Sequence, residues 1–141
     1  MSFLLDTNVV SEWVKPRPDP GLVAWLAESD EDRLFLSVVT LTELRYGVER
    51  LAAGRRQRQL DAWLSDELPL RFEGRMLPVD AAIAEGGGRL MALSEAAGRP
   101  IGTADAFIAA TARMRSLTLV TRNVSDFTRV LEAVVSPWRD S

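Results

Sequence analysis

Short apolar runs alternate with longer segments of helical spacing along almost the whole chain. The runs are Phe3–Asp6, Leu34–Val38, Met76–Val79, Leu117–Thr121 and Ala133–Ser136. Strand–helix alternation of this kind predicts an α/β fold with a central, mostly parallel sheet covered by helices on both faces. In such sheets, functional sites form beyond the carboxyl ends of the strands. Polar side chains that end a run are therefore the first candidates for chemistry.

Helices are predicted between these runs. Asp19 followed by Pro20 is typical of an N-cap and a first helical position. The predicted helices begin near Asp19, Thr40 and after Gly54, and cover Asp80–Ala97 and Thr103–Arg115. Three glycines at 86–88 indicate a kink or a close helix contact, because a phosphate loop would instead lie between a strand and a helix. No linker divides the 141 residues, so a single domain, 1–141, is expected.

The absent residue types exclude several chemistries. The chain has no histidine and no cysteine, which removes the usual nucleophile pairs and the nitrogen and sulfur ligands of zinc. Lys15 is its one lysine and lies in a proline-rich turn, so a P-loop has no candidate lysine. Polar chemistry must come from carboxylates, hydroxyls, amides or arginines. Oxygen-only sites favour Mg²⁺ or Mn²⁺.

Charge and hydropathy indicate where the protein acts. The net charge of −3 disfavours nonspecific nucleic-acid binding, but the 17 basic residues include 16 arginines, enough for a local basic groove. The arginine-rich segment 54–59 is interpreted first as a solvated helix start and second as a phosphate contact. No apolar run reaches about 20 residues, and no basic region precedes the first one, so a cytoplasmic protein without a membrane span or signal peptide is expected.

Asp6 and Glu43 are two candidate functional carboxylates. Asp6 ends the first run, where a buried charge is costly without a partner, although it can also cap a helix that begins near Thr7. Glu43 borders an apolar helix face, and Gly47 leaves space one turn later. Its alternative interpretation is a first-turn glutamate, in a capping box with Thr40.

Asp105 is the third candidate carboxylate. Ile108, Ala109 and Ala112 share its helix face, and their small or apolar side chains favour tight packing that turns Asp105 inward. The helix dipole alone would also favour an exposed aspartate there. If the three carboxylates converge, their repulsion raises the pKa values unless a cation neutralises them. A divalent ion is the simplest partner.

Oxygen-bearing side chains near the end of the fourth run extend this candidate site. Asn123 and Asp126 are further oxygen ligands, and Thr121 is a hydrogen-bond partner for water at the ion. Asn123 is neutral, and Asp126 is interpreted mainly as a turn or cap residue.

Four motifs then resemble one family in order and spacing. L-L-D-T-N-V-V-S-E, T-E-L-R-Y-G, A-D-A-F-I-A-A-T-A and L-V-T-R-N-V-S-D-F resemble the PIN-domain ribonucleases, in particular the VapC and FitB-like toxins of bacterial toxin–antitoxin operons. The resemblance covers essentially the whole chain. It implies a three-layer α/β/α fold, Mg²⁺- or Mn²⁺-dependent RNA cleavage, a homodimer, and a small antitoxin whose C-terminal segment covers the active site.

The resemblance also implies roles for individual residues. Asp6, Glu43 and Asp105 match the acidic cluster of the family, with Asp6 and Asp105 as the principal metal ligands. Glu43 is then a ligand or positions water, and Asn8 orients Asp6. At the fourth position many members carry an acid, where this sequence has Asn123. The neutral amide puts a second metal in doubt.

Two other classes of function compete with this hypothesis. The first is phosphoaspartyl chemistry, as in receiver domains or haloacid-dehalogenase-like phosphatases, with Asp6 as acceptor. D-T-N lacks the second aspartate of the phosphatase D-x-D pattern, and Lys15 is poorly placed for the required lysine. The second is a nonenzymatic module that has the same fold and only binds a partner. Metal-dependent RNA cleavage by the partner-free protein separates the three.

Overall fold

The computed structural model describes residues 1–139. They contain one sheet of five strands in the order β3-β2-β1-β4-β5, and every pairing is parallel. The strands are β1 (Phe3–Leu5), β2 (Leu34–Ser37), β3 (Met76–Leu77), β4 (Thr118–Val120) and β5 (Val134–Val135). All five lie inside the runs predicted from the sequence, so the α/β fold with a parallel sheet is confirmed.

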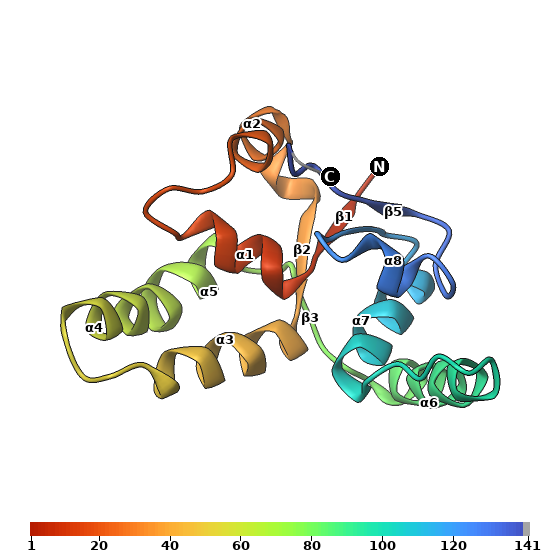
Figure 1. The fold of residues 1–141 in the computed structure, drawn as a ribbon. Coiled ribbons are helices and arrows are strands. Elements are labelled where there is room, and N and C mark those ends of the chain that lie inside the picture. The colour runs from red at the N-terminus through yellow and green to blue at the C-terminus, as the bar shows by residue number, and fades with distance from the viewer. Residues whose placement is uncertain (140–141) are drawn as a thin grey trace.

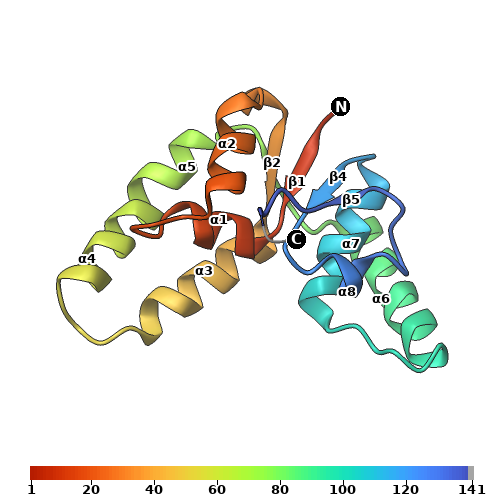
Figure 2. The same ribbon diagram turned by 45° about the horizontal axis from the view of Figure 1, so that its top comes forward.

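Helices cover both faces of the sheet, which makes three layers (Figures 1 and 2). They are α1 (Thr7–Trp13), α2 (Pro20–Glu28), α3 (Val38–Arg50), α4 (Arg55–Ala62), α5 (Leu68–Arg71), α6 (Ala81–Ala96), α7 (Thr103–Met114) and α8 (Val124–Phe127). Short 3₁₀ and π turns lie at Glu31–Arg33 and Trp63–Glu67. In Figure 1, α3 to α5 lie on one side and α6 and α7 on the other. No helix within residues 1–139 is long and apolar enough to cross a membrane.

The two layers of helices enclose separate hydrophobic cores, and β1 contributes to both. Leu5 is buried in the core beneath α1 and α3, whereas Leu4 is buried in the core beneath α6 and α7. Successive residues of a strand point to opposite faces, so a strand between two layers of helices must be apolar on both. This requirement explains why the first run is continuously apolar up to Asp6.

The strand order places a crevice at the carboxyl ends of β1 and β4. From β1 the chain continues outward to β2 and β3, and then returns to the other side of β1 to form β4 and β5. Leu5 pairs with Val120, so the next residues, Asp6 and Thr121, leave the sheet side by side. Ligand sites of open α/β sheets form at such a reversal of strand order.

Two details of the helices concern the sequence predictions. Helix α3 begins at Val38 rather than near Thr40, because Ser37 caps it by accepting a hydrogen bond from Val39 N. The glycines 86–88 do not interrupt α6; instead, a Cβ on Gly87 would lie 2.8 Å from the Phe107 ring. The predicted close helix contact, here between α6 and α7, is confirmed.

Candidate active site

Asp6 is buried at the point where β1 ends and α1 begins. Its backbone N–H continues the sheet by donating to Val120 O at 2.9 Å. Its carboxylate accepts a 2.8 Å hydrogen bond from Thr7 N and so caps α1. The capping interpretation of Asp6 is thus correct, and it leaves the other carboxylate oxygen for a second purpose.

Thr121 and Asn8 hold that second oxygen. Thr121 Oγ1 donates to Asp6 Oδ2 at 2.8 Å, and Asn8 Nδ2 donates to the same oxygen at 3.3 Å. Thr121 Oγ1 also accepts from Asn8 Nδ2 and from Asn123 N, both at 3.1 Å. A hydroxyl can donate only one hydrogen bond, and the Thr121 hydroxyl donates its bond to Asp6. Thr121 therefore positions Asp6, and its predicted hydrogen bond to water at an ion stays a prediction.

Glu43 reaches the site from α3 and is held by Thr7. Thr7 Oγ1 donates to Glu43 Oε1 at 2.5 Å and shares a 3.1 Å hydrogen bond with Thr40 Oγ1. Because Ser37 is the N-cap, Glu43 lies beyond the first turn of α3. The alternative of a capping box between Glu43 and Thr40 is therefore wrong. Sequence reasoning missed Thr7 as the link between α1 and α3.

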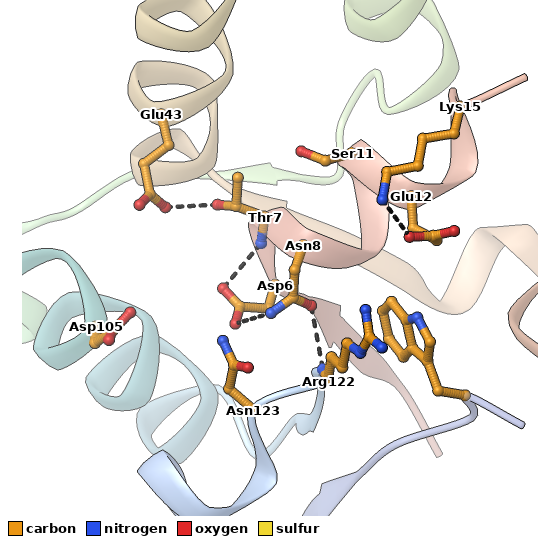
Figure 3. A pocket seen from close by; sticks show the side chains of 11 residues that line it. Asp6, Thr7, Asn8, Ser11, Glu12, Lys15, Glu43, Asp105, Arg122 and Asn123 are labelled. Carbon is orange, nitrogen blue, oxygen red and sulfur yellow. Dashed lines mark hydrogen bonds and ion pairs between the residues drawn. The ribbon is translucent and has the colours of Figure 1, made fainter. Parts of the chain in front are cut away.

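The three carboxylates and Asn123 line one cavity of about 390 Å³ (Figure 3). Asp105 is half-buried in the first turn of α7, and its carboxylate accepts no hydrogen bond from residues 1–139. Asn123 is exposed just after β4, while Asp126 lies in α8 and lines a neighbouring cavity that also includes Asp105. Asn123, not Asp126, is the N-cap residue of α8. Of the two interpretations of Asp126, a cap or a turn residue, the N-cap is therefore wrong, whereas its place in the single turn of α8 agrees with the second.

Burial and mutual repulsion shift the acidity of two of these groups. Burial chiefly raises the pKa of Asp6 to about 6; hydrogen bonds from Thr121 and Thr7 oppose the shift, and the charges of Asp105 and Glu43 add to it. Burial also raises the pKa of Asp105, followed by the charges of Glu43 and Asp126. No lysine or arginine among the described residues forms an ion pair with Asp6, Glu43 or Asp105. The site therefore has excess negative charge around a buried Asp6 and a half-buried Asp105.

These oxygen donors fit a hard divalent cation. Within the described chain, no group of three acidic side chains lies close enough to form a complete ligand cage. Mg²⁺ does not need one, because it keeps several waters and is commonly held by one or two carboxylates. Asp6, with two side-chain donors fixing one of its oxygens, and Asp105, with an unengaged carboxylate, match that pattern.

Five further residues line the same cavity and were not predicted: Ser11, Glu12, Lys15, Arg122 and Trp138. The buried Glu12 accepts from Lys15 Nζ at 2.8 Å and from Asp19 N at 2.9 Å. The hydrogen bond from Lys15 is the main cause of its lowered pKa. Arg122 lies over the Trp138 ring. The spacing of Glu12 and Lys15 was a signal for their contact, whereas nothing local in the sequence brings Trp138 to the site.

A titration of stability would test the environment of Asp6. The folded-state pKa of about 6 exceeds the ordinary 3.8, so between these values the folded chain binds more protons than the unfolded chain. Metal-free stability should then fall as pH rises through this window, by on the order of 3 kcal/mol from Asp6. Urea unfolding in EDTA at several pH values measures the slope. Asp6→Asn should remove most of this fall; equal slopes in both proteins would contradict the prediction.

Comparison with known proteins agrees with this geometry. Residues 3–132 match the family model of the PIN domain. The chain therefore belongs to the PIN-domain family. It is 39% identical to toxin FitB of Neisseria gonorrhoeae, over 98% of this chain and 99% of that protein. It is 36% identical to VapC ribonuclease Y4jK of Sinorhizobium fredii, over 96% and 97%.

Solved structures give the same result. The structure of FitAB bound to an IR36 DNA fragment superposes with a TM-score of 0.90 and 36% identity, covering 97% of this chain and 96% of that one. FitAcB from Neisseria gonorrhoeae superposes with a TM-score of 0.90 and 38% identity, covering 97% and 99%. The resemblance inferred from the four motifs is confirmed for family and fold.

Proposed function

We propose that this chain is a divalent-metal-dependent endoribonuclease and the toxin of a bacterial toxin–antitoxin pair. The observation that carries the proposal is the cavity at the carboxyl ends of β1 and β4, which Asp6, Glu43 and Asp105 all line without an ion pair to any described residue. Kinship to a ribonuclease named VapC and to toxin FitB supports the same activity. Mg²⁺ or Mn²⁺ is the ion that these oxygen donors favour.

In this proposal, Asp6 and Asp105 hold the ion, directly or through water. The bound ion supplies charge stabilisation on the phosphate oxygens and lowers the pKa of a water. Glu43, fixed by Thr7, orients water or adds a ligand. Thr121 and Asn8 keep the Asp6 carboxylate in one orientation. With no histidine in the chain, proton transfer to solvent passes through a carboxylate or water.

The proposed partners follow from the relatives. One solved relative is FitAB bound to an IR36 DNA fragment. We propose that this chain is a single domain that forms a homodimer, binds a corresponding small antitoxin and acts in the cytoplasm. An arginine of the antitoxin is suited to the acidic cavity, because guanidinium groups bind carboxylates through two hydrogen bonds.

The test is cleavage of RNA by the purified, partner-free protein. Mg²⁺-dependent cleavage that disappears in the Asp105→Asn variant supports the proposal. Formation of an acyl phosphate on Asp6 with a phosphodonor, without RNA cleavage, would favour phosphoaspartyl chemistry. Partner binding with neither reaction would identify a nonenzymatic module.

The fourth site residue can be tested separately. Asn123→Asp adds a charge to the cavity and should tighten the binding of a second ion by about 2- to 5-fold, a modest gain because position 123 is exposed. Asp126→Asn should change metal affinity less, since Asp126 does not line this cavity. Manganese titration by calorimetry compares both variants with the wild type. A large loss in Asp126→Asn with no change in Asn123→Asp would reverse the assignment.

A further inference from the structure

A second cavity adjoins the candidate active site. Its volume is about 380 Å³, and Asp105 lines both cavities. Its walls come from the loop before α7, from α8 and from the segment after α8. Asp105 therefore lies between the acidic cavity and a neighbouring cavity that contains basic as well as acidic side chains.

Two arginines, Arg99 and Arg129, line this second cavity. Both are exposed, and neither forms an ion pair with a residue of the described chain, although Asp126 lies only three residues before Arg129. Some other arginines are paired, since Arg45 binds Asp61 and Arg71 binds Glu31. Arg99 and Arg129 thus remain available for an anion from outside.

The surroundings of the two arginines fit an anion of modest size. Gly102 is the N-cap residue of α7, and no side chain accepts a hydrogen bond from the first N–H groups of this helix. The space beside Gly102 is open. The acids in the cavity are Asp105 and Asp126, and Asp105 is the residue assigned above to the metal ion. A phosphate is the anion whose geometry guanidinium groups match best.

We propose that Arg99 and Arg129 bind the phosphate next to the one that is cleaved, and so position single-stranded RNA across Asp105. This inference rests on the proposed ribonuclease function. The contact is made equally before and during the reaction, so it should affect KM rather than kcat. Because the two arginines contact a phosphate and not a base, they should strengthen the binding of every RNA sequence equally.

The test compares Arg99→Ala/Arg129→Ala with the matched control Arg33→Ala/Arg89→Ala, whose arginines are exposed and line neither cavity. RNA affinity is measured in an Asp6→Asn background at several salt concentrations. The first pair should weaken binding about 10-fold, and the slope of log K against log salt should fall by about 0.7, the value for one phosphate contact. Arg99→Lys/Arg129→Lys should keep the slope but lose part of the affinity.

Each outcome has one meaning. RNA cleavage by the wild type, with equal affinity and KM in both double variants, would overturn this inference and leave the proposed function standing. A wild type that neither binds nor cleaves RNA would overturn the proposed function as well. If poly-glutamate binds the wild type but not the Arg99→Ala/Arg129→Ala variant, while RNA affinity is equal in both, the cavity takes an acidic protein segment and the phosphate assignment is wrong.

Discussion

Replacing Asp6 or Asp105 with asparagine should lower the rate of RNA cleavage by at least about 100-fold, because each change removes a charge that holds the ion at the scissile phosphate. The fold should survive. Asp105 accepts no hydrogen bond from the described chain, and removing its charge relieves repulsion from Glu43 and Asp126. Asp105→Asn should therefore raise the stability of the metal-free protein.

Asp6→Asn should stabilise the metal-free protein less than Asp105→Asn. The Asp6 carboxylate accepts from Thr7 N on one oxygen and from Thr121 and Asn8 on the other. An amide offers one accepting oxygen only, so one of these donors loses its partner. Single-turnover cleavage and urea unfolding measure the two effects. The matched control is Asp66→Asn, because Asp66 is exposed and lines neither cavity. Wild-type cleavage by both site variants would refute the site assignment.

Removal of the divalent ion should abolish cleavage, and Mg²⁺ or Mn²⁺ should restore it. The affinity for the ion should also depend on pH, because a protonated Asp6 cannot bind a cation. With the pKa of Asp6 at about 6, affinity should fall roughly tenfold per pH unit below that value and level off above it. Manganese calorimetry across this range gives the profile.

The control for the metal prediction is the Asp6→Asn variant, whose residual affinity should lose this pH dependence. Full activity in excess EDTA would eliminate a metal mechanism. A pH profile that does not change on replacing Asp6 would mean that another group, such as Asp105, controls ion binding.

The strands of the sheet and the three candidate carboxylates could be predicted from the sequence, because both depend on local patterns. Phe3 to Leu5 must be apolar on both faces, so the first charge after them marks the end of β1. The inward face of α7 was visible in the spacing of Ile108 and Ala109 from Asp105. The helix starts near Asp19, after Gly54, at Asp80 and at Thr103 also agree with the prediction. Helix α3 differs, because Ser37 caps it and it begins at Val38, two residues before Thr40.

Contacts between distant segments could not be predicted in the same way. The Thr121 hydroxyl donates its hydrogen bond to Asp6, which lies 115 residues away in the chain. The Thr7 hydroxyl donates to Glu43, which is 36 residues away. Such pairings depend on strand register and helix packing, which brings together residues with no shared pattern in the chain.

The sequence by itself determined the class of fold and identified three acids that line one cavity, because apolar periodicity acts locally. Its missing residue types led to the proposal of an oxygen-bound metal ion. Only the tertiary structure decided how these acids are oriented, and that no lysine or arginine of residues 1–139 forms an ion pair with them. It also placed Arg99 and Arg129 in one cavity with Asp105, since α7, α8 and their flanking loops meet only when the sheet has formed. A site at the ends of parallel strands is assembled by the fold, from residues that each strand and helix presents separately.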